Sequence, residues 1–509
     1  MLLNVKGMTQ SFLLISLTLG QFAQATLTPT RADRGQSKVF FDIPNSGGRQ
    51  EACIIPRFLP GVKYAKDALE TMQELCSLNF HATTVTPGQR PALACQKLNS
   101  TNPGLNIYDL SDAITSHSDK NINCSNVELY SDKDLVEKAG KYKQSTSCSY
   151  TPGIMAYFHV SQALGKVGNV PEAVMRTFDL QSHLEIADDA MERIAYVKKH
   201  DPKLYQSYSM IELTLGSLRN KLAKPTDPKH SDALITDGFK ESFGAFLLNP
   251  NREDRYAELF VRPNDADVKN ALAVDKNAKP NLQRAFAFKR AQPHFQIVKN
   301  PASIKSLVSA EMGNYDTLIN MRDIADMVVI DTIMSQEDRF GNVAYQPFTA
   351  LLLQNAEGKE KIELVNPKKV QQKVIEFNKE GYKVISTDEV KQMILKDNDC
   401  SVSRDNVLGK AGLVKELSHL DPKTYQGLLK FNASLQDPAV KAIFRVDFYF
   451  SESDYAKMQQ NANQVTKLLQ TACQNQKLNL PGQKLHLDLD IEGYMETGTV
   501  AAQSCELQP

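Results

Sequence analysis

Two short polar segments in the second half of the chain hold residues that could do chemistry. Asp338 is followed four positions later by Asn342, in a glycine-containing turn directly after a nearly all-apolar stretch. Further along the chain stands Asp397-Asn398-Asp399. A carboxylate can orient an attacking hydroxyl and accept its proton, while an amide oxygen and a second carboxylate can hold magnesium against nucleotide phosphates. These residue types in this order indicate phosphoryl transfer.

Each segment also has a plainer interpretation. An Asp-x-x-x-Asn spacing is expected roughly once by chance in a chain of this length at average composition. Asp338 could be an ordinary turn residue that bonds its own backbone, and Asp397-Asn398-Asp399 could be a helix-ending turn or a calcium-tolerant loop. The spacing alone therefore decides nothing.

The elements around the two segments must position them. A helix from about Met321 to Ser335 is so rich in apolar residues that we expect it to be buried on most of its circumference. After the Asp338 turn, Ala350–Leu353 and Ile362–Val365 flank Gly358, and Val374–Phe377 and Tyr382–Ile385 flank Gly381. We predict two successive β-hairpins there.

Other stretches predict more helix and one further strand. Helices are expected from about Gly153 to Leu164, from Leu184 to Lys199, and from a capping pair at Ser451 and Asp454 to Cys473. Residues 485–491 alternate between apolar and polar side chains, which predicts a half-buried strand. Helices and strands in blocks favour an α+β architecture.

The first residues predict an export signal. An apolar stretch from Phe12 to Leu19 precedes Ala23-Gln24-Ala25, a small-x-small pattern that signal peptidase accepts. We therefore expect a signal peptide over residues 1–25, an uncleaved anchor being the alternative, and a mature protein that is secreted or periplasmic and does not span a membrane.

Eight cysteines follow the expected signal, five of them before residue 150. The even count behind an export signal predicts disulfides, whose connectivity the sequence leaves open. Zinc is the competing explanation, but no Cys-x-x-Cys and no His-x-x-x-His pair is present. The first third of the chain should accordingly be a loop-rich, disulfide-stapled region.

Composition excludes several classes of function. The 509 residues carry 59 basic and 59 acidic side chains, so no global field recruits nucleic acid. The motifs of serine hydrolases, P-loop proteins, dinucleotide-binding folds and zincins are missing.

Residues 276–305 hold seven basic and no acidic side chains. We interpret them as a solvated loop rather than an anion site, because no phosphate-cradling glycine pattern accompanies them.

The motifs resemble those of the secretory-pathway protein kinases of the Golgi casein kinase type, and more distantly those of phosphatidylinositol and HipA-like kinases. The resemblance covers about residues 150–405 and rests on Gln336–Asn342, the Asp397-Asn398-Asp399 turn, and Thr151–Val160 followed by Val170-Pro171. It implies a two-lobed, protein-kinase-like fold that binds ATP with Mg²⁺ or Mn²⁺ between the lobes. Asp338 would be the catalytic acid/base, Asn342 and Asp397 metal ligands, and Asp399 a substitute for Asp397.

The sequence departs from the family pattern in three places. Asn342 lies four rather than five positions after Asp338, Phe340 stands where a histidine is usual, and Ile154 occupies the place of the glutamate that pairs with the ATP-binding lysine. That lysine is not assigned by the motifs: Lys133, Lys141 and Lys143 are equal candidates.

The resulting hypothesis is a secreted kinase-like phosphotransferase that acts on a protein hydroxyl, or on a glycan or lipid. The alternatives are transfer of the AMP part within the same fold, a catalytically dead pseudokinase, and a disulfide-stapled binding protein. The expected divisions are 1–25 signal peptide, 26–147 Cys-rich region and part of the N-lobe, 148–300 N-lobe helices and insertion, and 301–509 helical C-lobe.

Overall fold

The protein is described here by a computed structural model. The described residues are 39–44, 50–82, 84–116, 122–131, 135–227, 234–236, 240–249, 254–255, 279–291, 315–478 and 505–507, with five single positions between 266 and 277. The expected signal peptide and the strand expected at residues 485–491 lie outside this part of the chain.

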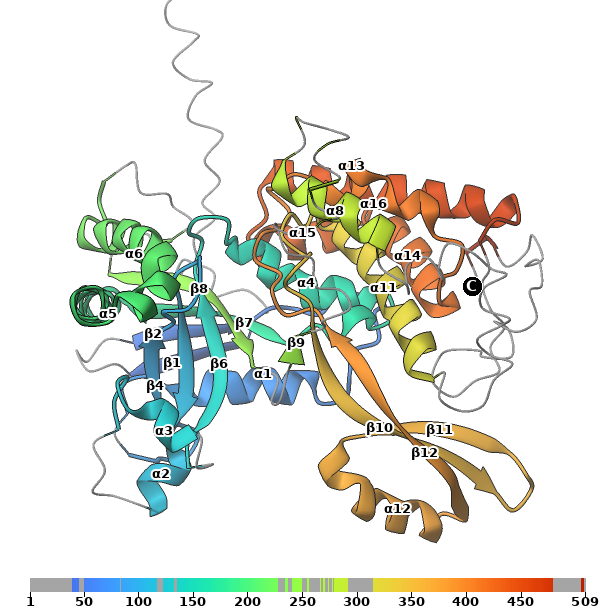
Figure 1. The fold of residues 1–509 in the computed structure, drawn as a ribbon, viewed down its shortest axis with the longest axis horizontal. Coiled ribbons are helices and arrows are strands. Elements are labelled where there is room, and N and C mark those ends of the chain that lie inside the picture. The colour runs from blue at the N-terminus through green and yellow to red at the C-terminus, as the bar shows by residue number, and fades with distance from the viewer. Residues whose placement is uncertain are drawn as a thin grey trace, which may run out of the picture.

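An eight-stranded sheet forms the first half of the fold, which we call the sheet lobe (Figure 1). Its strands lie in the order β1-β2-β7-β8-β6-β5-β4-β3, and every pairing is antiparallel except that of β3 with β4. Their bounds are β1 Val39–Pro44, β2 Gln50–Ile55, β3 Leu78–Asn79, β4 Arg90–Gln96, β5 Gly104–Asp109, β6 Glu137–Lys143, β7 Ala173–Asp179 and β8 Glu241–Leu248.

Six helices accompany the sheet: α1 Ala68–Ser77, α2 Ser111–Ser116, α3 Val127–Ser131, α4 Thr151–Ala163, α5 Leu180–His200 and α6 Pro202–Ala223. Helices α5 and α6 pack on each other through a small core of their own, which includes Ile194, Ile211 and Leu215. Helix α4 contacts β7 and β8 on one side and α14 (Pro422–Ser434) of the second half on the other. Because α4 lies between two layers, twelve of its residues are buried.

The second half, the helical lobe, gathers α8 Pro280–Ala291, α11 Tyr315–Ile333, α13 Val407–Ala411, α14, α15 Pro438–Val446 and α16 Glu452–Gln474 (Figure 1). Short 3-10 turns lie at Val167–Asn169, Pro367–Lys369 and Leu413–Glu416. The described residues of α11 from Ile319 onward are almost all buried, and α16 begins with the expected capping box of Ser451 and Asp454. One hydrophobic core joins the lobes, with Phe246 of the sheet and Ile330 of α11 among its members.

The α+β class and the two-lobed arrangement expected from the sequence are therefore present. The expected helices are confirmed with small shifts of their bounds: α4 for Gly153–Leu164, α5 for Leu184–Lys199, and α11 for Met321–Ser335. Among the described helices, none is both long enough and apolar enough to cross a membrane.

One of the two predicted hairpins is wrong. β10 (Ala344–Asn355) and β11 (Glu360–Val365) pair around Gly358 as expected. The segment taken as the next strand is helix α12 (Val370–Lys379), and β12 (Tyr382–Ile394) pairs with β10 instead. Val370, Val374 and Phe377 recur at helical spacing and pack against the sheet, a periodicity that the short window around Val374 conceals.

β10, β11, β12 and α12 form a module that projects from the lobes (Figure 1). It has a small core of its own around Leu351, Leu353 and Phe377. A two-residue strand, β9 (Asp254–Arg255), pairs with the start of β10.

All eight cysteines are paired, as Cys53–Cys76, Cys95–Cys124, Cys148–Cys400 and Cys473–Cys505. Two of the four disulfides staple the sheet lobe, which confirms the disulfide-rich N-terminal region. Disulfides persist in oxidising compartments outside the cytoplasm, and the pairing is consistent with such a location.

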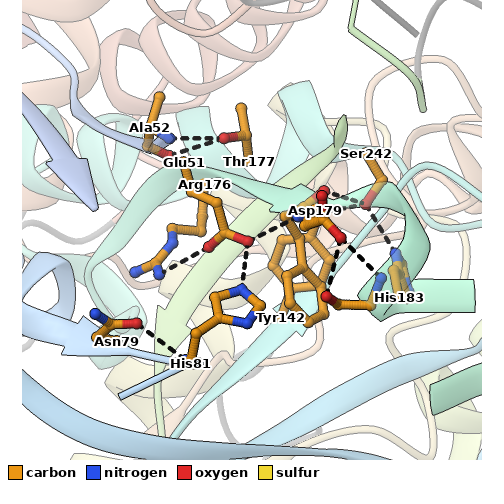
Figure 2. Close-up of polar contacts among 12 residues, drawn as sticks. Glu51, Ala52, Asn79, His81, Tyr142, Arg176, Thr177, Asp179, His183 and Ser242 are labelled. Atoms are coloured by element: carbon orange, nitrogen blue, oxygen red, sulfur yellow. Dashed lines mark hydrogen bonds and ion pairs between the residues drawn. The ribbon is translucent and has the colours of Figure 1, made fainter. Parts of the chain in front are cut away.

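A buried polar cluster anchors the edge of the sheet to its centre. Figure 2 shows Glu51 of β2 between Arg176 of β7 and His81, at 3.3 Å from Arg176 Nη2 and 2.7 Å from His81 Nε2. The side chains of Glu51 and Arg176 are fully buried, and Arg176 also donates to the carbonyl of Leu78 at 2.7 Å. A buried charge requires its partner, so this cluster should be sensitive to loss of one member.

We expect Arg176→Met to lower the free energy of unfolding by about 3–5 kcal/mol, because it removes the arginine charge from the buried Glu51 and the donor from the carbonyl of Leu78. Urea denaturation measures the change. The matched control is Arg219→Met, which breaks the half-exposed pair of Arg219 with Asp188 and should change stability by less than about 1 kcal/mol. Equal losses in the two variants would contradict the assignment of Arg176 as an anchor.

Two buried histidines predict how stability depends on pH. Burial lowers the pKa of His159 to about 3 and that of His183 to about 3. Their ordinary pKa, which applies to the unfolded chain, is about 6.5, so the unfolded state binds more protons between pH 6.5 and 3. Stability is therefore present above pH 6.5 and is lost as the pH falls through this window.

Acidification from pH 7 to 5 should weaken folding by on the order of 2 kcal/mol for each of the two histidines. Denaturant titrations at both pH values measure it. His183→Gln, which can still bond Ser242 Oγ, should remove the contribution of one histidine to the loss of stability between pH 7 and pH 5. An unchanged pH dependence in this variant would count against a neutral, buried His183.

Candidate active site

A cavity of about 330 Å³ lies between the two lobes. The sheet lobe lines it with residues of the β4–β5 loop and with Lys141 and Lys143 of β6. The helical lobe lines it with Arg284, Gly341 and all four side chains that the sequence singled out, which are Asp338, Asn342, Asp397 and Asp399. Residues more than 250 positions apart thus meet in one cleft, since Lys143 and Asp397 are separated by 254 positions.

Arg339 holds the loop that carries Asp338. Its guanidinium is fully buried and makes a two-pronged ion pair with Asp331 of α11, with Nε–Oδ2 at 2.6 Å and Nη2–Oδ1 at 3.0 Å. The hydroxyl of Tyr157, on α4, donates to the same Asp331 Oδ1 at 2.5 Å. Burial and the nearby Asp331 raise the pKa of Tyr157 well above its usual range, so this hydroxyl stays a donor. The loop is fixed to two helices that lie far apart in the sequence.

The same arginine fixes the Asp397–Asp399 turn. Arg339 Nη2 donates to Asn398 Oδ1 at 2.6 Å, and Gln336 Nε2 donates to the carbonyl of Asp397 at 3.1 Å. Asn398 in turn donates to the carbonyl of Leu395 at 2.6 Å. The middle residue of Asp397-Asn398-Asp399 therefore faces the protein interior, which leaves the two acids on either side of it at the cleft.

Asp338 is a partly buried carboxylate in a mixed electrostatic environment. Burial raises the pKa of Asp338 to about 6, against the opposing charge of Arg284 and with further upward contributions from Asp399 and Asp397. Arg284 Nη1 lies 3.4 Å from Asp338 Oδ1. The amide nitrogen of Asn342 donates to Asp338 Oδ2 at 3.1 Å and to its carbonyl at 2.8 Å. Such a carboxylate is ionised near neutral pH yet basic enough to accept a proton.

Lys143 joins the two acids of the turn. Its ammonium lies 2.7 Å from Asp397 Oδ1 and 3.0 Å from Asp399 Oδ2. Burial acts to raise the pKa of Asp397, but Lys143, Lys97 and Lys141 outweigh it and hold that pKa below its usual range. Burial likewise acts to lower the pKa of Lys143, but Asp397 and Asp399 raise it above its usual range. Both partners are therefore charged across the neutral pH range.

Sequence reasoning left three contributors to this cleft unassigned. Lys143 could not be separated from Lys133 and Lys141; Lys133 lies outside the described residues. Lys143 is the last residue of β6, the strand that precedes α4, and this position is the signal that could have favoured it over the other two lysines. Arg284 lies in the basic segment 276–305, which the sequence predicts to be a solvated loop rather than an anion site, yet it lines the cleft. The β4–β5 loop, from which Asn102 reaches Asp399 Oδ2 at 3.5 Å, carried no motif.

The departures from the kinase pattern have structural counterparts. Phe340, in the usual place of a histidine, is buried against Phe288 of α8 with ring centroids 4.7 Å apart. Helix α4 holds Ile154 where a glutamate is usual, and no residue from Thr151 to Ala163 is acidic. Lys143 therefore takes its partners from the Asp397–Asp399 turn.

Part of the basic segment 276–305 is helical rather than a loop. Residues 280–291 form α8, because Ala285, Ala287 and Phe288 bury one side of it. Acidic side chains balance part of the segment's charge, since Lys279 pairs with Asp405 and Lys289 with Glu416.

The oxygen donors of the cleft suit a hard cation. Asp397, Asp399 and Asn342 offer carboxylate and amide oxygens, which Mg²⁺ and Mn²⁺ prefer. The amide nitrogen of Asn342 is engaged by Asp338, which leaves the amide oxygen as the atom able to face a cation. Within the described residues no group of three or more His, Cys, Asp or Glu side chains is arranged around a metal position. A cation here would thus need oxygens from a bound ligand or water as well.

Comparison with known proteins adds one structural likeness. No family model and no curated protein matches the chain. Among solved structures, the chain is similar to the crystal structure of the Golgi casein kinase with Mn/ADP bound, with a TM-score of 0.34 and 10% sequence identity over 74% of this chain and 71% of that one.

Arg339→Lys tests how much the two-pronged ion pair of Arg339 with Asp331 and its bond to Asn398 contribute to stability. Lysine keeps the charge but cannot make the two-pronged contact with Asp331 and reach Asn398 as well. We expect the free energy of unfolding to fall by about 2–4 kcal/mol, measured by urea denaturation. Arg445→Lys is the control, because Arg445 pairs with the exposed Glu452 and should change little. A loss in Arg339→Lys no larger than in the control would contradict this role.

Proposed function

We propose that this protein is an extracytoplasmic ATP-dependent phosphotransferase that moves the γ-phosphoryl group of ATP, in the presence of Mg²⁺ or Mn²⁺, to a hydroxyl of a protein. A glycan or lipid hydroxyl is the alternative acceptor. The observation that carries the proposal is the convergence of Lys143, Asp338, Asn342 and Asp397 on one cleft between two lobes. These are the types of group that kinases use in such a place: a strand lysine, a catalytic aspartate, an asparagine and a metal-binding aspartate.

The residues of the chain have distinct tasks in this proposal. Lys143, held charged by its acidic neighbours, attracts the phosphates. Asp338 accepts the proton of the acceptor hydroxyl at its carboxylate, and Asn342 fixes that carboxylate through its amide nitrogen. Asp397 and the amide oxygen of Asn342 would hold a divalent cation, which, when bound, neutralises charge on the phosphate oxygens. The β4–β5 loop lines the cleft from the sheet side.

A second candidate function is nucleotide binding without transfer, as in a pseudokinase. The observation that favours it is the lack of any acidic residue in α4, which removes the usual partner of the phosphate-binding lysine. A disulfide-stapled binding protein with no nucleotide site is the third reading, and it gives no reason for these four side chains to share a cleft.

Thermal unfolding with ATP and Mn²⁺ separates the two nucleotide-binding functions from the binding protein with no nucleotide site. A ligand at a hundred times its dissociation constant stabilises the folded state by about 2.7 kcal/mol. We expect such a stabilisation in the native protein, its loss in Asp397→Asn, and its retention in the control Asp189→Asn, whose side chain is exposed on α5. No stabilisation of the native protein would remove both nucleotide-dependent readings.

Labelled ATP then distinguishes transfer from binding. With ATP carrying ³²P in the γ position, label should enter protein in the native sample and not with Asp338→Asn, which should still bind ATP. With ³²P in the α position, no label should enter. Incorporation from α-labelled ATP would replace phosphoryl transfer by AMP transfer, and binding without either label transfer would favour the pseudokinase.

A further inference from the structure

Lys143 needs a fixed partner that α4 cannot provide. Its side chain is only 13% exposed, and a buried ammonium is stable only when paired. In protein kinases a glutamate on the helix after the lysine strand makes this pair, and the pair couples the position of that helix to the phosphate site. Here the corresponding helix, α4, is free of acidic residues from end to end.

The two acids that contact Lys143 differ in exposure. The side chain of Asp397 is 32% exposed, whereas that of Asp399 is 9% exposed. Asp399 also faces the amide of Asn102 in the β4–β5 loop, which in turn donates to Cys148 Sγ at 3.2 Å. Both acids line the cavity, but Asp397 is the more exposed of the two, and Asp399 is the one more enclosed by protein groups.

The backbone at Asp399 is attached to the start of α4. The amide of Tyr150, the residue before the helix, donates to the carbonyl of Asp399 at 2.8 Å. The next residue, Cys400, is joined to Cys148 by a disulfide. Gly153, in the first turn of α4, lies so close to Ser401 that a Cβ there would sit 2.3 Å from Ser401 Oγ. Three independent contacts thus hold residues 399–401 against α4.

We propose that Asp399 is the positioning residue for Lys143, and that it conveys the position of α4 to the phosphate site in place of a helix glutamate. The link runs from α4 through the Cys148–Cys400 disulfide and the Tyr150–Asp399 backbone bond to the carboxylate of Asp399, and from there to the ammonium of Lys143. Asp397 is left to face cation and nucleotide. This inference rests on the proposed function, because it assigns Lys143 to nucleotide phosphates, and it replaces the metal-ligand role that the sequence suggests for Asp399.

A double-mutant cycle on nucleotide affinity tests this assignment. Lys143→Met, Asp399→Asn and the double variant are titrated with a fluorescent ADP analogue in Mn²⁺, and Mn²⁺ alone is titrated by its electron paramagnetic resonance signal. An unpositioned lysine must be ordered when the nucleotide binds, so Asp399→Asn should weaken ADP binding about five- to tenfold. The double variant should bind ADP no more weakly than Lys143→Met, because Asp399 acts through Lys143.

Binding of Mn²⁺ alone separates positioning from metal ligation. It should stay within about threefold of the native value in Asp399→Asn and fall much further in Asp397→Asn. A parallel loss of Mn²⁺ in both variants, or multiplied losses of ADP affinity in the double variant, would make Asp399 a ligand and overturn the inference while leaving the proposed function intact. Native protein that binds no ADP would overturn both.

A substitution outside the cleft tests independently whether α4 is coupled to the nucleotide site. In Gly153→Ala the new Cβ would sit 2.3 Å from Ser401 Oγ, so either α4 shifts or the Ser401 hydroxyl leaves its bond to the carbonyl of Asn398. Either change disturbs the contact of residues 399–401 with α4, and it should weaken ADP binding as Asp399→Asn does, with Mn²⁺ binding unchanged. Gly216→Ala on α6 is the matched control, since a Cβ there meets nothing closer than 4.0 Å. Unaltered ADP affinity in a folded Gly153→Ala protein would show that α4 is not coupled to the site.

Discussion

The buried ion pair between Arg339 and Asp331 is the constraint on which the cleft depends. A fully buried guanidinium is tolerated only when its donors are satisfied, and here Asp331 of α11 and the side chain of Asn398 accept from it. The hydroxyl of Tyr157, on α4, donates to the same Asp331. The arginine and its partners come from three segments that are distant in the sequence. Pairing the charge therefore requires the loop, the turn and the helix to meet, and the acids of the cleft take their places as a consequence.

The pairing of β10 with β12 keeps the Asp338 loop close to the Asp397–Asp399 turn. β10 begins at Ala344, two residues after Asn342, and β12 ends at Ile394, three residues before Asp397. Ala344 lies opposite Ile394 in the antiparallel register. The chain therefore returns to the place where β10 began, so the projecting module with α12 can be inserted between the Asp338 loop and the Asp397–Asp399 turn without separating them.

Lysines of the sheet lobe supply the positive charge that faces the acids of the cleft. Lys143 and Lys141 stand two positions apart on β6 and so share one face of the strand, which is the face that lines the cavity. Together with Lys97 they hold the pKa of Asp397 below its usual range, whereas burial, with smaller contributions from Asp399 and Asp397, raises the pKa of Asp338. Two carboxylates in one cavity thereby acquire different proton affinities, which is the condition for one to hold a cation while the other accepts a proton.

The sequence by itself determined helices α4, α11 and α16, because Pro152 in the first turn of α4, the apolar content of α11 and the capping box of α16 are local signals. It also indicated Asp338, Asn342, Asp397 and Asp399 through the types and order of the residues, though the role of each stays a prediction. It misread α12 as a strand, since a window of four residues cannot separate a period of two from one of 3.6. Only the tertiary structure decided that Lys143 faces the acids, that Arg284 lies beside Asp338, and that Cys148 pairs with Cys400, because each of these contacts joins residues between 54 and 256 positions apart and no local pattern records which distant segments will meet.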